Sequence, residues 1–163
     1  MFQNKKILFF RHAESKYSFN ASDDHEISLT DKGIRDCYIV AKKLKVFNVV
    51  PDLFISSSAK RALETCSILK DSLNSKSEIN ISPTIYNNNV LSLLKVIKNI
   101  DDMFNCILIV GHNPTMQNIA NIVNDNNIYL FPPCSFIYCD FYKSKWIEFS
   151  FDIINLAKLR INN

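Results

Sequence analysis

The segment Ile7-Leu8-Phe9-Phe10-Arg11-His12-Ala13-Glu14-Ser15 joins four consecutive apolar residues to an arginine and a histidine. The apolar run predicts a buried strand, and the two polar residues follow at its carboxyl end. In an open α/β sheet, ligands bind at that end of the strands. Arg11 could hold an anion bidentately while a neutral nitrogen of His12 attacks its central atom. A single Arg-His pair is also typical of an ordinary loop, so this prediction needs further anion-binding residues.

A second predicted strand is followed by another arginine. Leu53-Phe54-Ile55 indicates a short buried strand, and Ser58 is a natural N-cap for the helix after it. Arg61 then lies in the first helical turn, at the positive end of the dipole, where a cation is unfavourable. An anion bound beside Arg61 would remove this conflict. The buried face of this helix is expected to contain Ala62, Cys66, Leu69 and Leu73.

A third predicted strand ends in a histidine. Cys106-Ile107-Leu108-Ile109-Val110 is strongly apolar and runs into Gly111-His112-Asn113-Pro114. Asn113 is expected to be the N-cap of the next helix, and Pro114 its first residue, where a missing N–H has no cost. His112 is thereby placed between the end of a strand and the start of a helix.

These arginines and histidines all follow the carboxyl ends of predicted strands. In a parallel sheet such ends lie along one edge, so side chains about a hundred residues apart can meet in one crevice. Two guanidinium groups and two imidazoles, with no carboxylate required among them, suit a phosphoryl group. The cations neutralise its oxygens while one imidazole attacks the phosphorus atom in line.

The remaining segments complete an α/β pattern. Leu29-Thr30-Asp31-Lys32-Gly33 opens a helix with Thr30 as its expected N-cap. The polar segment 16–28 predicts a solvated loop, and its Asp23-Asp24-His25-Glu26 run is not expected to bind a metal, because adjacent side chains diverge. The patterns also predict a strand at residues 79–81, a helix at 90–97, and late strands at 135–142 and 146–154.

Composition limits the classes of protein to which the chain can belong. The 163 residues suit one domain, residues 1–163, with 47% hydrophobic and 21% charged residues, as in ordinary globular proteins. The net charge of +3 is small and the lysines are spread along the chain, which argues against nucleic acid as a partner. The two glycines, Gly33 and Gly111, lie too far apart to form a glycine-rich phosphate loop.

Cysteine usage and hydropathy bear on the compartment. The five cysteines show no paired spacing and fall mostly within apolar patterns, which indicates reduced core thiols and a cytoplasmic protein. The apolar run after the N-terminal lysines is too short for a signal peptide, and no segment reaches membrane-spanning length. We therefore expect no membrane partner.

In their order along the chain, these motifs resemble those of the histidine phosphatase superfamily. Arg11-His12-Ala13-Glu14 is similar to the family's Arg-His-Gly-Glu, with alanine in place of glycine. The Leu-Thr-x-x-Gly at residues 29–33 and the Ser-Ser-Ala-Lys-Arg-Ala-Leu-Glu-Thr at 57–65 match two further family segments. Val110-Gly111-His112-Asn113-Pro114 and Phe131-Pro132-Pro133-Cys134-Ser135 are similar to segments of the short SixA-type phosphohistidine phosphatases.

The resemblance implies a phosphoglycerate mutase-like α/β fold of three layers, with a mixed, mostly parallel six-stranded sheet flanked by helices. It also implies a phosphohistidine intermediate on His12. By the same resemblance Arg11 and Arg61 bind the phosphate, and His112 donates a hydrogen bond to it as the protonated imidazole. To attack, His12 must present a neutral nitrogen, so a backbone carbonyl is expected to hold its other N–H.

Two departures from the family pattern bear on the chemistry. Larger family members place a glutamate general acid after the third strand, whereas residues 83–89 contain no carboxylate. SixA-type proteins often carry an arginine two residues before the Leu-Thr pair, where this chain has Ile27. Candidate replacements for that phosphate ligand are Lys16, His25 and Lys32, and Ser18 is a further candidate substrate-binding residue.

The function favoured by these features is hydrolysis of phosphohistidine on a signalling protein of the histidine phosphotransfer type. An imidazole leaving group is far less basic than an alkoxide, so a missing general acid is compatible with this reaction. One alternative is a small-molecule phosphomonoesterase or mutase, with Asp23, Asp24 or Glu26 as the acid. Another is a catalytically weak module that binds phosphoproteins. No metal or other cofactor is expected, and the protein is expected to act as a monomer.

Overall fold

The structure is a computed structural model that describes residues 4–17, 21–86, 89–124 and 130–160. Its strands are β1 (Asn4–Arg11), β2 (Leu53–Ser57), β3 (Ile79–Ser82), β4 (Cys106–Gly111), β5 (Phe136–Tyr142) and β6 (Asn155–Arg160). They form one sheet in the order β3-β2-β4-β1-β5-β6. The pairs β2–β3, β2–β4 and β1–β4 are parallel, whereas β5 runs antiparallel to β1 and to β6. The predicted mixed, mostly parallel sheet is confirmed.

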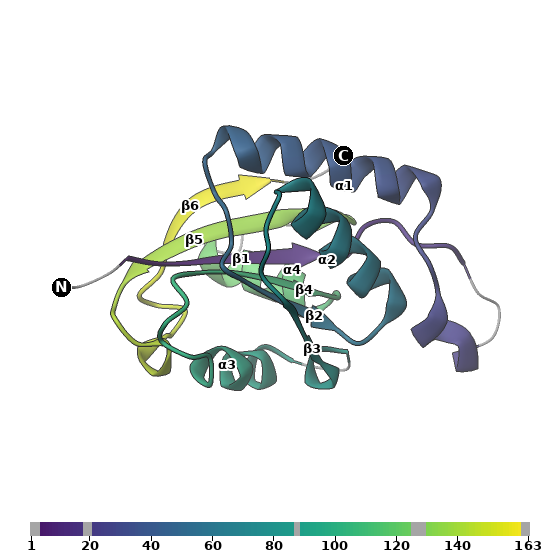
Figure 1. Ribbon diagram of the computed structural model, residues 1–163. Helices are drawn as coiled ribbons and strands as arrows, with labels where there is room; N and C mark the ends of the chain where they lie inside the picture. The colour runs from purple at the N-terminus through teal and green to yellow at the C-terminus, as the bar shows by residue number, and fades with distance from the viewer. Residues whose placement is uncertain (1–3, 18–20, 87–88, 125–129, 161–163) are drawn as a thin grey trace.

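Helices cover both faces of this sheet and make the three layers visible in Figure 1. Helices α1 (Asp31–Val46) and α2 (Lys60–Ser72) pack on one face, and α3 (Val90–Lys98) and α4 (Thr115–Val123) on the other. Shorter 3-10 turns are η1 (Ala21–Glu26), η2 (Pro83–Ile85) and η3 (Trp146–Glu148). Within the described part of the chain, none of the helices combines the length and apolar character needed to cross a bilayer.

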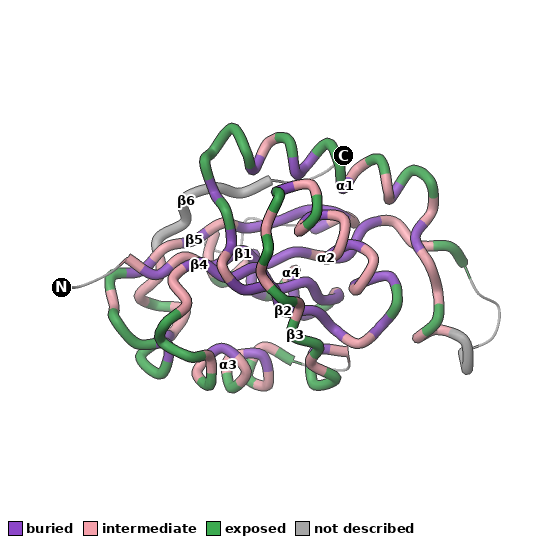
Figure 2. The backbone as a smooth tube through the Cα atoms, viewed as in Figure 1, coloured by how far each residue is buried: buried purple, intermediate pink, exposed green. Residues whose placement is uncertain are grey.

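Strand β1 lies inside the sheet and is apolar on both faces. Leu8 and Phe10 belong to the core beneath α1 and α2, whereas Ile7 and Phe9 belong to the core beneath α3 and α4. Figure 2 shows the inner strands β1, β2 and β4 buried along most of their length. Burial on both faces explains why this strand is a continuous apolar run rather than an alternating pattern.

The prediction of a strand at residues 146–154 is wrong. The chain instead forms η3 there, and β6 begins only at Asn155. Trp146 is fully buried, its backbone N–H donates to Asp102 Oδ1 at 2.7 Å, and its indole N–H donates to the Phe104 carbonyl at 2.9 Å. These long-range bonds hold the segment against the α3–β4 connection, and local sequence pattern could not reveal them.

The predicted helix caps are confirmed at one helix and wrong at two. Thr30 caps α1, where its hydroxyl accepts a hydrogen bond from the Gly33 N–H at 3.0 Å. The N-cap of α2 is Ala59 rather than Ser58, whose hydroxyl lies 2.9 Å from His25 Nε2. The N-cap of α4 is Pro114 rather than the preceding asparagine. In both of these cases a polar side chain binds a distant residue in preference to the helix end.

Gly33 fixes the approach of α1 to the end of β1. The Glu14 carbonyl accepts a hydrogen bond from the Thr30 N–H at 3.0 Å, and Ser15 pairs with Leu29 in an antiparallel bridge. A Cβ atom on Gly33 would lie 2.2 Å from the Glu14 carbonyl oxygen. The first turn of α1 therefore needs glycine for packing, although Gly33 has no positive φ.

Gly33→Ala should destabilise the protein by about 1–3 kcal/mol, the usual effect of forcing atoms into a packed contact. In an exposed helix the same change is stabilising by up to about 1 kcal/mol, so the sign of the effect is diagnostic. Urea unfolding would measure it, with the exposed Arg35→Ala in the same helix as a control expected to stay within about 0.5 kcal/mol of wild type. A neutral or stabilising Gly33→Ala would contradict this account of the contact.

Candidate active site

The register of three adjacent parallel strands brings the predicted site residues together. Arg11, the last residue of β1, lies opposite Gly111, and the pairing of β2 with β4 places Ser56 opposite Val110. The His12 N–H donates to the Gly111 carbonyl at 3.0 Å, which extends the ladder beyond the strand end. The rings of His12 and His112 consequently lie with their centroids 5.0 Å apart.

His12 is held in a state suited to nucleophilic attack. Its Nδ1 lies 2.7 Å from the Ala13 carbonyl oxygen, which can only accept, so Nδ1 carries the proton and Nε2 is left as the basic nitrogen. Burial, followed by the charges of Arg61 and Arg11, lowers the pKa of His12 to about 4. The backbone carbonyl expected from the sequence is therefore present, and the imidazole is neutral at pH 7.

His112 is also neutral in the free protein. Burial, with the neighbouring His12 and Arg61, lowers the pKa of His112 to about 3. The protonated imidazole expected of His112 when phosphate is bound stays a prediction, because these causes act in the free protein. His112 Nε2 lies 2.8 Å from the Ser57 hydroxyl, which also accepts a hydrogen bond from the Ala59 N–H at 3.3 Å.

Arg11 is anchored by one nitrogen and leaves others available. Its NH1 group donates to the Phe131 carbonyl at 2.7 Å, and the side chain of Asn113 donates to the same oxygen at 3.1 Å. Arg11 Nε and His112 Nδ1 are buried and make no hydrogen bond within the described residues. Buried polar atoms of this kind are unfavourable unless an acceptor is supplied, and an oxyanion would supply several to the guanidinium group.

Arg61 meets a carboxylate that sequence reasoning assigned to a solvated loop. The guanidinium group donates to the Asp24 carbonyl, and its NH2 group lies 2.9 Å from Asp24 Oδ2. The Tyr86 hydroxyl donates to the same carboxylate oxygen at 2.6 Å. The hydrogen bond from Tyr86 is the largest cause that lowers the pKa of Asp24, and the hydrogen bond from Arg61 adds to it. Asp24 is therefore a carboxylate in the free protein.

Tyr86 lies just after η2, in the segment 83–89 that contains no carboxylate. Its ring lies edge-on to the rings of His112 and His25, with centroid separations of 5.7 Å and 4.9 Å. Sequence reasoning missed Tyr86 and Ser57 as site residues, and it named Asp24 only as a possible acid of the alternative reaction, not as a partner of Arg61. Only Ser57 had a signal, because it begins the segment that resembles the family motif.

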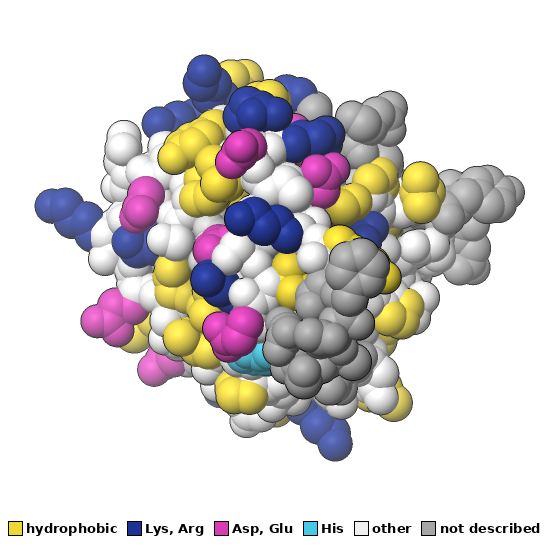
Figure 3. Space-filling view, turned by 90° about the vertical axis from the view of Figure 1, so that its right-hand side faces the viewer, with side chains coloured by type: hydrophobic (Ala, Val, Ile, Leu, Met, Phe, Trp, Pro, Cys, Tyr) yellow, Lys and Arg dark blue, Asp and Glu magenta, His cyan; other side chains and the backbone are white. Residues whose placement is uncertain are grey.

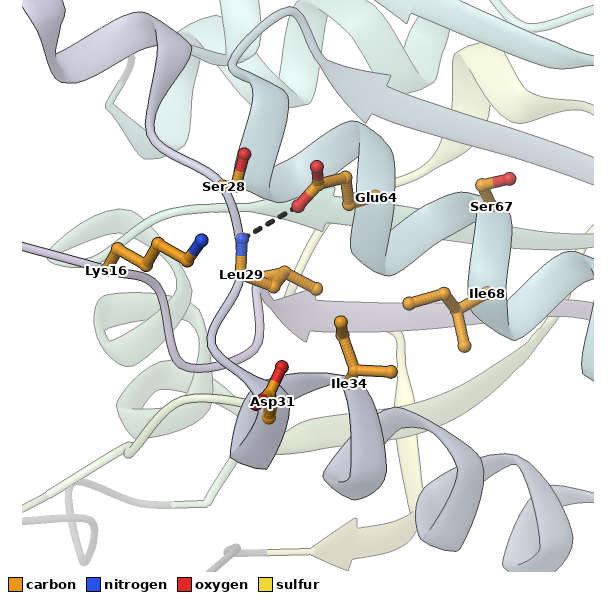
Figure 4. Close-up of a pocket in the computed structure, with 8 residues that line it drawn as sticks. All are labelled: Lys16, Ser28, Leu29, Asp31, Ile34, Glu64, Ser67 and Ile68. Carbon is orange, nitrogen blue, oxygen red and sulfur yellow. Dashed lines mark hydrogen bonds between the residues drawn. The ribbon is translucent and has the colours of Figure 1, made fainter.

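The other candidates are not brought to His12. Lys32 forms an ion pair with Asp36 at 2.8 Å, and Lys16 lines a separate hollow between α1 and α2, drawn in Figure 4. Ser18 lies outside the described residues. His25 is nearer the site, at its rim, where it contacts Tyr86. Within the described residues, no cluster of three or more His, Cys, Asp or Glu side chains is arranged to hold a metal.

His12 and His112 are hidden from solvent. Figure 3 shows the end of the molecule toward which β1 points, and only a small area of histidine is visible on it. His12 is 9% exposed and His112 is 8% exposed. Lys and Arg side chains gather at the top of the same face, where α1 lies. The two imidazoles and the guanidinium group of Arg61 are thus buried side chains at this end of the sheet.

The lowered histidine pKa values predict a pH-dependent stability. An unfolded chain with an ordinary histidine pKa of about 6.5 binds protons between pH 6.5 and pH 4 that folded His12 does not bind. Stability should therefore fall as the pH decreases through this window, with a slope approaching about 1.4 kcal/mol per pH unit for each such histidine. Urea unfolding at pH 7.0 and pH 5.0 would measure it, and His12→Gln should show a smaller loss than wild type. An unchanged slope in His12→Gln would contradict the assignment.

Known proteins match the sequence of this chain in the region that contains three of the site residues. The sequence model of the histidine phosphatase superfamily (branch 1) matches residues 7–87, which include His12, Arg11 and Arg61. An uncharacterized chloroplastic protein of Arabidopsis thaliana is 23% identical over 154 residues, 89% of this chain and 70% of that protein.

Solved structures share the fold. A candidate phosphohistidine phosphatase SixA from Agrobacterium tumefaciens has a TM-score of 0.80 at 20% identity, covering 96% of this chain and 97% of its own. The protein histidine phosphatase SixA complexed with tungstate has a TM-score of 0.73 at 18% identity, covering 85% and 90%. With its Arg-His pair, its second arginine and its second histidine at the ends of adjacent parallel strands, the chain belongs to the histidine phosphatase superfamily.

Proposed function

We propose that this phosphatase of the histidine phosphatase superfamily hydrolyses phosphohistidine on a protein. The observation that supports this proposal most directly is that Asp24, which is hydrogen-bonded to Arg61, is ionised in the free protein. Asp24 is held ionised by Tyr86 and Arg61, so it has no proton to give a leaving group at neutral pH. Of the other loop carboxylates considered as acids, Glu26 is exposed and lies 3.3 Å from His25. A substrate that needs no proton donor suits such a site.

The reaction follows from the positions of the basic groups. Nε2 of His12 attacks phosphorus and forms a P–N bond as the P–N bond to the substrate histidine breaks. A substrate ring already protonated on its second nitrogen leaves as neutral imidazole with the electron pair of the broken bond. Water then attacks the phosphorus of phosphorylated His12, releasing inorganic phosphate and restoring the neutral ring. Arg11 and Arg61 stabilise the charge on the transferred group in both steps.

The short connection that follows β3 also supports a protein substrate. The connection from β3 to α3 contains the short turn η2 and then reaches Val90, which leaves no room for an inserted lobe over the crevice. The SixA structures that share this fold are described as phosphohistidine phosphatases, one of them binding the oxyanion tungstate. A phosphohistidine on the surface of a partner could therefore reach His12.

One observation favours a second candidate, a small-molecule phosphomonoesterase. Asp24 is hydrogen-bonded to the arginine expected to bind phosphate, so its carboxylate lies close to the leaving group of any substrate held there. A phosphate dianion beside it would raise the pKa of Asp24, which could then act as an acid toward an alkoxide.

A covalent intermediate on His12 is the first test. Incubation with a phosphohistidine protein should give an acid-labile, alkali-stable phosphoryl label on the wild-type enzyme in a single turnover. The label should be absent from His12→Ala, because the free Nε2 is gone, and present in His25→Ala, which removes a histidine from the rim of the site only. Equal labelling of wild type and His12→Ala would overturn the assignment.

Asp24→Asn separates the two candidate reactions. If Asp24 is a general acid, the variant should lose about 10²-fold or more in rate. If the enzyme is a phosphohistidine phosphatase that needs no acid, the variant should turn over within a few-fold of wild type. Removing the negative charge beside Arg61 should also tighten inhibition by inorganic phosphate, by about 3- to 10-fold. Rates on phosphohistidine protein, p-nitrophenyl phosphate and phosphoserine would be compared, with Asp101→Asn at the other end of the sheet as the control. A rate on phosphoserine that collapses in Asp24→Asn would favour the second candidate.

A further inference from the structure

A second hollow lies beside the catalytic crevice, along the same helix. It has a volume of about 430 Å³ and lies between the start of α1 and the middle of α2. Figure 4 shows Ile34 from α1 and Ile68 from α2 pointing toward each other across it, with the side chain of Leu29 beside Ile34. Its floor is therefore apolar and is formed by side chains of the core beneath α1 and α2.

The rim of this hollow carries an excess of negative charge. Asp31 stands in the first turn of α1 and Glu64 on α2, while Lys16 is the one cation of the lining. One carboxylate oxygen of Glu64 accepts a hydrogen bond from the Leu29 N–H at 2.7 Å, which fixes the side chain at the edge of the hollow. Lys16 is exposed and makes no ion pair with another described residue, so its ammonium group can swing toward solvent.

The hollow lies within reach of whatever Arg61 binds. Arg61, Glu64 and Ile68 are spaced by three and four residues and so lie on one side of α2. With a rise of 1.5 Å per residue, Glu64 and Ile68 are about 5 Å and about 10 Å along the helix axis from Arg61. A macromolecule with a phosphoryl group in the crevice would therefore place its neighbouring residues over the hollow.

We propose that this hollow is a specificity site for the substrate protein, and that it receives a lysine or arginine side chain about one helical turn from the phosphohistidine. The inference rests on the proposed function. The aliphatic part of such a side chain would pack on Ile34 and Ile68, and its cation would lie between Asp31 and Glu64. Residues three or four apart on a helix are separated by about 5–6 Å, which matches the distance along α2.

The charges of the two sites are complementary to such a segment. The crevice around His12 contains two guanidinium groups and attracts the phosphoryl anion, whereas the rim of the hollow attracts a cation. A substrate with an acidic residue at the same place would meet Asp31 and Glu64 with like charge. The pair of sites therefore selects among phosphohistidine proteins and fixes the direction in which they bind.

Synthetic helical peptides with one phosphohistidine would test this proposal. A lysine or a glutamate is placed three or four residues before or after the phosphohistidine, with the rest of the sequence constant. For at least one position, kcat/KM should be about 5- to 10-fold higher for the lysine peptide, as expected for partly exposed charge pairs. Equal kcat/KM at all four positions would overturn the role of the hollow alone. Failure to hydrolyse any of the peptides would overturn the proposed function and this inference with it.

Two variants assign the preference to the hollow. Glu64→Gln keeps an acceptor for the Leu29 N–H but loses the charge, and should bring the preference to within about twofold. Ile68→Lys places a cation in the hollow and should reverse the preference toward glutamate. Hydrolysis of p-nitrophenyl phosphate, which has no neighbouring residue, should stay within about twofold of wild type in both.

The matched control is Glu148→Gln, which removes an exposed carboxylate near the opposite end of β1. It should leave the lysine preference unchanged. A preference that falls equally in Glu148→Gln and Glu64→Gln would reflect net charge and would overturn the assignment to the hollow.

Discussion

The parallel register of β1 with β4, and of β4 with β2, is the constraint on which the site depends. Because Arg11 lies opposite Gly111, the chain leaves both strands at one level, and the residues that follow face each other across a short distance. The ladder continues for one more bond, from the His12 N–H to the Gly111 carbonyl. A shift of one residue in this pairing would turn each side chain to the opposite face of the sheet and separate the two imidazoles.

Bringing basic groups together in a buried crevice has an electrostatic consequence that also prepares the chemistry. Burial, together with the neighbouring basic groups, lowers the pKa of both imidazoles, so both are neutral and Nε2 of His12 is free of a proton. The guanidinium groups find acceptors in the protein, Arg11 in the Phe131 carbonyl and Arg61 in Asp24. An oxyanion offers the same kind of acceptor, so the substrate competes with bonds that the protein makes to itself.

The other end of β1 is fixed as firmly as the catalytic end. Lys5 is 1% exposed, and its ammonium group donates to the Asp102 and Phe104 carbonyls at 2.7 Å each. The same group lies 5.5 Å from the centre of the Trp146 ring. A strand held at both ends and buried on both faces is a rigid base for a nucleophile, because its position does not depend on a mobile loop.

Most of the strands and helices, and the basic residues gathered at one end of the sheet, could be predicted from the sequence. Three apolar runs, each followed within a few residues by Arg11, Arg61 or His112, predicted three strand ends and a phosphoryl site. Burial on both faces requires such runs, and charged residues cannot continue them. The held Nδ1 proton of His12 was also predicted, since attack requires a neutral nitrogen.

Which groups surround those residues depends on how distant parts of the chain pack together. Asp24 is bonded to Arg61 across 37 positions in the chain, and Tyr86 reaches Asp24 across 62. Ser58 leaves its expected helix cap for His25, and the buried Trp146 replaces an expected strand with a turn. The hollow beside α2 likewise exists only where α1 and α2 meet. Local pattern reports which face of an element is apolar, but the partner of a polar group depends on distances that only the packed chain determines.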